Sequence, residues 1–343
     1  MNQKELLKLP LAQRLVLALE LEKELREDEG FVSAAERAEL KKLIGELAVP
    51  QETVDQTATI YPSVLDKSIL ITGTSTGSIA IDCAEHLLAN GWKVYTTVRS
   101  QEEYVINQQK GFIPFLMDYR YSDQIDNLVN FVLTDNGGKL GALFNNGGYS
   151  QYGFLEDVPV EALSEIFEAN FLGWIELTEK LLPFMTSQGY GRVIMHGSIL
   201  GNIPLNYRGA YSITKSSIKT LTYDLRNRYK DLGIAVSMIE TGPVRSKIRY
   251  KSLSYFEKYI DKENSRFKDL YKEQVAEFLN NPNQVNAYTE QPISVAMRLL
   301  DAIESESPNA RYMVTMPTYT FDAYKKTLSL DNCLAMSWLD STE

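Results

Sequence analysis

An alternation of strand-like and helix-like segments, beginning near residue 67, constrains the fold of this chain most. The strand-like runs are short and rich in β-branched and aromatic residues, and stretches long enough for an amphipathic helix separate most of them. The runs occupy residues 68–72, 93–98, 112–117, 142–145, 191–197, 233–240 and 311–315. Strands joined through helices indicate an α/β fold, a doubly wound parallel sheet of about seven strands covered on both faces. Such sheets bind ligands at the carboxyl ends of their strands, so chemically important residues should follow a strand.

The first sixty residues differ in composition from the rest. Phe31 is the only aromatic residue before Tyr61, although the chain holds 20 Tyr, 13 Phe and 3 Trp. Leucine and alanine recur there at spacings of three and four, and Ser33 with Glu36 forms a capping box at the start of a second helix. We expect a helical hairpin arm and linker over residues 1–55. This arm could bind a partner, govern oligomerisation or pack on the main domain.

Composition excludes several classes of protein. A net charge of −10 disfavours binding to nucleic acid or to an anionic membrane. Cys83 and Cys333, together with only two histidines, provide neither a disulfide framework nor a metal site. The apolar stretch over residues 9–21 contains Gln13, Arg14 and Glu20, so we expect no membrane span and no signal peptide. We therefore expect a cytoplasmic protein.

The first strand runs into a loop that contains Gly73, Ser75, Thr76 and Gly77, and a helix follows. Glycines allow the backbone to approach a pyrophosphate, and the N-terminus of a helix offers free N–H groups and a partial positive charge. We predict that these four residues bind a dinucleotide.

The same loop also fits the G-x-S-x-G nucleophile elbow of α/β-hydrolases, with Ser75 as the nucleophile. A hydrolase would need a histidine late in the chain, but only His86 and His196 follow. The elbow normally comes after several strands, whereas this loop follows the first. The hydrolase stays a remote alternative.

A second group of residues follows the fifth strand. Ser198 comes directly after it, and Tyr211 and Lys215 are four residues apart, so they share one face of a helix. The pKa of tyrosine is about 10, and a nearby ammonium lowers it. Tyr211 could then exchange a proton while Ser198 hydrogen-bonds the reacting oxygen. A tyrosine and a lysine at this spacing do not by themselves indicate a catalytic site. The pair becomes informative because it occurs together with the other motifs.

Together, these residues closely resemble the short-chain dehydrogenase/reductase family over roughly residues 66–320. The T-G-x-x-x-G loop is matched by Thr72, Gly73 and Gly77, and Ser198, Tyr211 and Lys215 match the family's serine, tyrosine and lysine. Further matches are Asn145, Asn146, Gly147 and Gly148 for the N-N-A-G segment, and Asn170 for the helix asparagine. The resemblance makes residues 66–325 an NAD(P)-binding Rossmann catalytic domain, and we also expect a homodimer or homotetramer.

The resemblance also implies roles for these residues. Tyr211 would be the general acid and base, Ser198 would orient the substrate, and Asn170 would hold a water that relays protons. Lys215 would lower the tyrosine pKa and bind the nicotinamide ribose. Asn146, Gly147, Val244 and Ser246 would line the cofactor site, and Asp118 would contact the adenine. The loop departs from the family pattern because Ile79 or Ala80 replaces its third glycine.

The end of the second strand indicates the cofactor. An acidic residue there binds an adenosine-ribose hydroxyl in NAD-dependent relatives and repels a 2′-phosphate. This strand ends at Val98 and Arg99 without a carboxylate. Arg99 could pair with a 2′-phosphate, so we favour NADP(H) over NAD(H).

Residues 246–292 read as a substrate lid within the catalytic domain. Several aromatic residues lie there, among them Tyr250, Tyr255, Phe256 and Tyr271. They suggest an apolar alcohol or carbonyl substrate, as in the hydroxysteroid and retinol dehydrogenase branch that the segment around Val244 resembles. The same aromatic residues could instead dock the lid or form a subunit contact. The second function considered is a non-catalytic nucleotide sensor on the same fold.

Overall fold

The protein is described by a computed structural model that covers residues 59–275, 285 and 288–327. In the N-terminal part it describes helix α1 (Gln3–Leu6) and the isolated residues 8, 14, 17, 21, 36, 39, 40 and 43. Most of the helical hairpin predicted over residues 1–55 therefore lies outside the described residues. Residues 276–284, 286 and 287 of the predicted lid also lie outside them.

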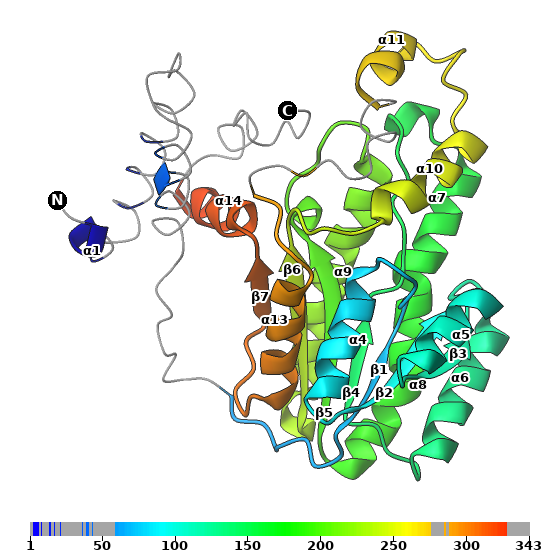
Figure 1. Cartoon of the computed structure of the whole chain (residues 1–343), viewed down its shortest axis with the longest axis vertical. Coiled ribbons are helices and arrows are strands. Elements are labelled where there is room, and N and C mark those ends of the chain that lie inside the picture. Colours follow the sequence, from blue (N-terminus) through cyan, green and yellow to red (C-terminus); the bar gives the residue numbers. More distant parts are fainter. Residues whose placement is uncertain are drawn as a thin grey trace.

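A sheet of seven parallel strands forms the centre of the main domain (Figure 1). Its strands are β1 (Ser68–Ile71), β2 (Lys93–Val98), β3 (Ile113–Leu116), β4 (Ala142–Asn145), β5 (Gly191–Ser198), β6 (Ile234–Thr241) and β7 (Arg311–Val314). They lie in the order β3-β2-β1-β4-β5-β6-β7. The sequence prediction of a Rossmann-type doubly wound parallel sheet is confirmed, and each predicted strand end falls within one residue of the observed end.

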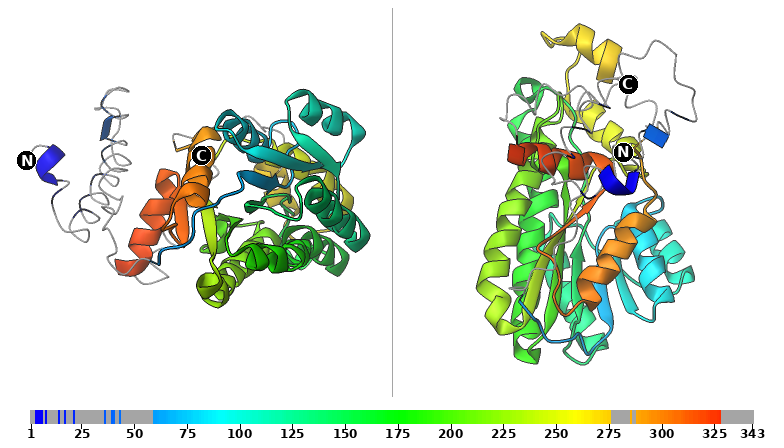
Figure 2. Two further views of the ribbon diagram at one scale, coloured as in Figure 1. Left: turned by 90° about the horizontal axis from the view of Figure 1, so that it is seen from below. Right: turned by 90° about the vertical axis from the view of Figure 1, so that its left-hand side faces the viewer.

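Helices cover both faces of the sheet (Figures 1 and 2). The helices that follow the strands are α4 (Ile79–Ala89), α5 (Gln101–Gln109), α6 (Ser122–Asp135), α8 (Gly173–Gln188), α9 (Gly209–Tyr229) and α13 (Ile293–Glu304). One apolar core lies between the sheet and α6, α8 and α9, and a second lies between the sheet and α4 and α13. On β1, Leu70 belongs to the first core, while Ile69 and Ile71 belong to the second. This alternation follows from the period of two along a strand.

The position of the ligand crevice follows from the strand order. The order of the strands reverses between β1 and β4, because β2 and β3 extend the sheet to one side and β4 to β7 extend it to the other. A crevice forms at such a reversal, beyond the carboxyl ends of the strands. The loop after β1 and the segment after β4 lie there.

The segment that follows β6 packs over this end of the sheet. It contains α10 (Ile248–Tyr259), the short helix α11 (Lys268–Leu270) and a π-helical turn (Tyr271–Val275). Phe256 and Tyr271 are buried in an apolar cluster with Tyr152 and Tyr207 of the main domain. Phe256 and Tyr271 thus dock this segment on the domain, whereas Tyr250 is exposed.

The last described helix follows the last strand of the sheet. Helix α14 (Met316–Thr327) follows β7 at the edge of the sheet. Within the residues that the structure describes, no helix is both long and apolar enough to cross a membrane.

Candidate active site

The glycine-rich loop after β1 lies against the segment after β4. Gly73 has a φ of +75°, and a Cβ atom on it would lie 2.5 Å from the Cα of Gly147. The Gly73 amide donates a hydrogen bond to the carbonyl oxygen of Thr97 at 3.1 Å. Only glycine combines this conformation with such a close approach. The two loops therefore form a cradle that a side chain at Gly73 would disrupt.

Two of the predicted loop residues, Thr76 and Gly77, are not among the described residues that line the cavity. Thr76 donates hydrogen bonds from its amide and its hydroxyl to Glu103, at 2.8 and 2.9 Å. The side chain of Lys247 covers Gly77. The backbone amide of Lys247 also donates a hydrogen bond to the Gly77 carbonyl oxygen at 2.9 Å. Ile79, which stands near the family's third glycine, begins α4 and lines the cavity.

Thr72 holds the segment after β4 in place. Its hydroxyl oxygen accepts hydrogen bonds from the amides of Asn146 at 2.9 Å and Gly147 at 3.1 Å. The buried Tyr119 hydroxyl lies 2.9 Å from the same oxygen. A Cβ atom on Gly147 would lie 3.2 Å from the Tyr119 ring, so this tyrosine favours glycine over the alanine usual in the family.

Asn170 lies in a π-helical segment (Glu168–Leu172) between α7 (Val160–Phe167) and α8. Its carboxamide oxygen accepts from the Tyr149 amide at 3.0 Å, and its nitrogen donates to the Tyr149 carbonyl oxygen at 2.8 Å. A Cβ atom on Gly148 would lie 2.5 Å from the carboxamide oxygen of Asn170. The π-turn and the glycine together bring a buried carboxamide to the cavity wall, and π-turns frequently occur at functional sites.

The predicted proton-transfer residues meet at the carboxyl end of β5. Ser198 ends this strand, and its hydroxyl oxygen accepts from the Leu200 amide at 3.2 Å. Lys215 Nζ lies 5.5 Å from the centroid of the Tyr211 ring and donates to the carbonyl oxygen of His196 at 2.7 Å. Ser198, Tyr211 and Lys215 all line one cavity.

Burial changes the proton affinities of this group. It lowers the pKa of Lys215 to about 7. It also raises the pKa of Tyr211, while a hydrogen bond with Ser198 and the charge of Arg208 act in the opposite direction. Desolvation disfavours the charged form of each group. Lys215 can therefore change its protonation near neutral pH.

His196, on β5, contacts the segment that follows β4 and the end of β6. Its Nδ1 lies 2.6 Å from the carboxamide oxygen of Asn146, and its Nε2 lies 3.3 Å from the Thr241 hydroxyl. Burial, with a smaller effect from the charge of Lys215, lowers the pKa of His196 to about 3. In the described part of the chain, Ser75 accepts a hydrogen bond from Lys251 and none from a histidine. The triad of the hydrolase alternative is therefore not formed there.

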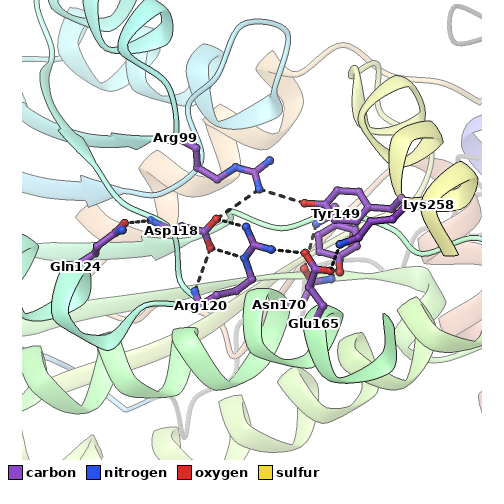
Figure 3. Close-up of polar contacts among 9 residues, drawn as sticks. Arg99, Asp118, Arg120, Gln124, Tyr149, Glu165, Asn170 and Lys258 are labelled. Carbon is purple, nitrogen blue, oxygen red and sulfur yellow. Dashed lines mark hydrogen bonds and ion pairs between the residues drawn. The ribbon is translucent and has the colours of Figure 1, made fainter. Parts of the chain in front are cut away.

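A chain of charged groups runs from the end of β2 to α7 (Figure 3). Arg99 Nη1 lies 3.7 Å from the Asp118 carboxylate, and Arg120 donates to that carboxylate through Nε at 3.0 Å and Nη2 at 2.7 Å. Arg120 also pairs with Glu165, which pairs with Lys258 at 3.1 Å. Burial raises the pKa of Asp118, but Arg120 and Arg99 outweigh this effect and hold the pKa below its usual range.

Helix α10 crosses the glycine-rich loop and Arg99. Lys251 donates from Nζ to the Ser75 hydroxyl, and the Tyr255 hydroxyl accepts from Arg99 Nη1 at 3.2 Å. The Tyr255 ring stacks on Tyr149, with 3.7 Å between the centroids and 11° between the planes. Residues four apart share a helix face, so one face of α10 covers this end of the cavity.

One cavity of ≈ 740 Å³ connects these groups. The predicted site residues that line it are Gly73, Ser75, Arg99, Asp118, Asn146, Gly147, Asn170, Ser198, Tyr211, Lys215, Val244 and Ser246. Among the described residues, Thr76 and Gly77 do not line it. The glycine cradle, the start of α4 and Lys251 at one end fit a pyrophosphate, so the residues present suit a dinucleotide.

Comparison with known proteins decides the family. The sequence profile of the short chain dehydrogenase family matches residues 67–254. The chain is also 33% identical over 267 residues to the uncharacterized oxidoreductase YbbO of Escherichia coli, covering 77% of this chain and 91% of that protein. This protein belongs to the short-chain dehydrogenase family. It is therefore an oxidoreductase with an NAD(P)-binding Rossmann fold. The family assigns it to the enzymes and not to the non-catalytic nucleotide sensors considered from the sequence.

One further relative of this short-chain dehydrogenase and one solved structure of similar fold have informative names. The NADPH-dependent 3-dehydrocapnine reductase of Ornithobacterium rhinotracheale is 28% identical over 262 residues, covering 74% of this chain and 90% of that protein. The solved structure of L-sorbose reductase from Gluconobacter frateurii, complexed with NADPH and L-sorbose, has a TM-score of 0.59 at 20% identity. It covers 74% of this chain and 96% of that chain, and it supports the fold.

Sequence reasoning missed several cavity residues of this dehydrogenase. Arg208, Arg249 and Lys251 line the cavity, whereas the predicted aromatic residues Tyr255 and Phe256 do not. Arg249 and Lys251 lie two residues apart on α10 within a segment of many charges, so no pattern distinguished them from solvent-exposed residues. The segment predicted as a lid thus presents Arg249 and Lys251 to the cavity, together with Ile248 and Tyr288.

Proposed function

We propose that this enzyme is an NADP(H)-preferring oxidoreductase that interconverts an alcohol and a ketone or aldehyde, with Tyr211 as its general acid and base. The convergence of Ser198, Tyr211 and Lys215 on the wall of a cavity that begins at the glycine-rich loop carries the proposal. The cofactor, when bound, supplies or takes up the hydride. The protein positions the substrate and moves the proton.

Three side chains divide the proton chemistry among them. In reduction, the Tyr211 hydroxyl donates its proton to the carbonyl oxygen of the substrate. The Ser198 oxygen accepts from the Leu200 amide, and its O–H, which lies within hydrogen-bond reach of Tyr211, would donate to the same substrate oxygen. Lys215, with a pKa of about 7, returns a proton to Tyr211, because groups that titrate near the working pH exchange protons most effectively.

Asn170 is the proposed holder of a water that connects this group to solvent. The Tyr149 backbone fixes its carboxamide through two hydrogen bonds, and Asn170 lines the same cavity as Lys215. A fixed carboxamide holds a water with little loss of entropy on binding. The role of Asn170 is to position the water rather than to react.

The preference for NADP(H) rests on Arg99. Its side chain is 54% exposed, lines the cavity and directly follows the end of β2, and the neighbouring Asp118 carboxylate is itself paired with Arg120. Guanidinium groups bind phosphate through paired hydrogen bonds. The NADPH-dependent relative from Ornithobacterium rhinotracheale supports the same preference.

The substrate has an apolar body in this proposal. Ile199, Leu200, Ile203 and Leu205 follow Ser198 and line the cavity. Apolar walls favour a substrate that buries carbon surface.

The homodimer or homotetramer expected from the sequence stays a prediction, and measuring the mass in solution with and without residues 1–55 tests it.

A spectrophotometric assay tests the proposed activity. NADPH or NADH is mixed with the protein and a panel of apolar aldehydes and ketones, and the nicotinamide absorbance is followed. We expect consumption of NADPH with a higher kcat/KM than for NADH. Equal kcat/KM values for the two cofactors would contradict the preference, and cofactor binding without turnover of any compound would contradict the reaction.

A further inference from the structure

Trp174 lies next to the proposed proton-transfer group without lining the cavity. It is the second residue of helix α8 and is fully buried. The ammonium nitrogen of Lys215 lies over the Trp174 ring, 4.7 Å from its centroid. Lys215 lines the cavity, whereas Trp174 is not among the described residues that do. Trp174 can therefore act on the reaction only through neighbours such as Lys215.

The indole ring is fixed in its position. Its Nε1–H donates a hydrogen bond to the carbonyl oxygen of Gly147 at 2.8 Å, and its centroid lies 6.3 Å from that of the Tyr119 ring. Asn170, four residues before Trp174, binds the backbone of Tyr149 through its carboxamide. The start of α8 thus holds the segment after β4 at two points, and the indole cannot turn without losing one of them.

The charge of Lys215 has few other partners. Nζ donates to the carbonyl oxygen of His196 at 2.7 Å and lies 5.5 Å from the centroid of the Tyr211 ring. The His196 imidazole is neutral at pH 7, because burial and the charge of Lys215 lower its pKa to about 3. Within the described part of the chain, no carboxylate offsets the burial of Lys215. One carbonyl oxygen and two aromatic rings therefore surround this ammonium.

We propose that Trp174 is a positioning residue of the reaction, whose indole face holds the Lys215 side chain and favours its ammonium form. The inference rests on the proposed function for the part that Lys215 plays in proton transfer. A cation within about 6 Å of a ring face is attracted by the negative charge of that face. The attraction is strongest for indole and increases where water is excluded.

The contact acts on one step of the proposed reduction. After Tyr211 has given its proton to the substrate oxygen, a proton moves from Lys215 Nζ to the Tyr211 oxygen, so Lys215 must carry that proton beforehand. Burial disfavours the ammonium form, and the Trp174 face opposes this effect. Trp174 therefore extends to higher pH the range in which the enzyme can reduce a carbonyl compound.

The first test measures the pKa of Lys215 without relying on turnover. The lysine ¹³Cε resonances of the full chain are followed against pH by NMR, and Lys215→Met identifies the resonance of Lys215. In Trp174→Leu the pKa of Lys215 should fall by about one unit, the size expected for a desolvated cation–π contact. In Trp174→Phe the fall should be smaller, because a phenyl ring keeps part of the attraction.

Leu181→Ala is the matched control for lost packing. Leu181 is buried in the same apolar core and lies seven residues, about two turns, further along α8. Truncating it disturbs the core but leaves the indole in place, so the pKa of Lys215 should stay unchanged.

Fluorinated tryptophan gives a second test that keeps the shape of the ring. Ring fluorines withdraw electron density from the indole face, so the pKa of Lys215 should fall stepwise as their number increases. Trp92 and Trp338 take up the same analogue. The Trp174→Phe protein labelled in the same way is therefore the control, and its Lys215 pKa should not depend on fluorination.

The results separate this inference from the proposed function. A Lys215 pKa that is the same throughout the fluorinated series, or that falls as far in Leu181→Ala as in Trp174→Leu, would overturn the role of Trp174. A stepwise fall in a protein that reduces none of the panel compounds would support that role and contradict the proposed reaction. Where reduction occurs, the pH at which its rate falls to half should decrease with the pKa of Lys215.

Discussion

The hydroxyl of Tyr255 accepts a hydrogen bond from the guanidinium of Arg99 at 3.2 Å, which joins helix α10 to the end of strand β2. The Tyr255 ring also stacks on Tyr149, in the segment after β4. Helix α10 and the proposed 2′-phosphate site are thus in direct contact. A ligand on Arg99 would compete with Tyr255 for the same guanidinium.

Arg99→Ala should weaken NADPH binding about tenfold or more and change NADH binding little, because only NADPH carries the charged group that the guanidinium would bind. Fluorescence titration of each reduced cofactor measures both dissociation constants. Tyr255→Phe is the control, since it removes the hydrogen bond to Arg99 and retains the charge. Equal weakening of both cofactors in Arg99→Ala would remove the argument for a 2′-phosphate site.

Lys251→Met should weaken NADPH and NADH by the same factor, roughly tenfold, because Lys251 reaches the loop that would bind the shared pyrophosphate. The same titration measures this. Lys258→Met on the same helix is the matched control, because Lys258 is 57% exposed and pairs with Glu165. A loss confined to NADPH would place Lys251 at the 2′-phosphate instead.

His196→Gln should make the protein less sensitive to acid. Burial lowers the pKa of His196 to about 3, from an unfolded value of about 6.5. Between these values the unfolded chain binds a proton that the folded protein does not, so stability falls as the pH falls. Protonation of this histidine in the unfolded chain should lower the free energy of unfolding by about 2 kcal/mol between pH 7 and pH 5.

Urea unfolding at pH 7 and pH 5 measures the effect. The loss of stability between the two pH values should be smaller in His196→Gln than in the wild type by that amount. Equal losses in the two proteins would show that the buried His196 is not the group responsible.

The central strands were predictable because they are buried on both faces. β5 and β6 are buried along their whole length, and their runs of β-branched and other apolar residues begin at or directly after Gly191 and Gly233. Ser198, Tyr211 and Lys215 were predictable because the fold fixes their spacing, with a strand end followed by one helix face.

The remaining cavity residues depend on contacts between distant parts of the chain. Thr76 lies in the predicted loop, yet its polar atoms bind Glu103, 27 residues later. Arg208, before α9, and Arg249, on α10, line one cavity although they lie far apart in the chain. Sequence spacing contains no information on such a contact.

The Tyr211→Phe variant tests directly whether Tyr211 is the general acid and base. It removes one hydroxyl and keeps the ring, and Tyr223→Phe, on an exposed part of the same helix, serves as its control. Single-turnover measurement with NADPH and a substrate from the panel gives the rate of the chemical step. We expect a rate about a hundredfold or more below the wild type, with NADPH binding unchanged. An unchanged rate in Tyr211→Phe would contradict Tyr211 as the general acid and base.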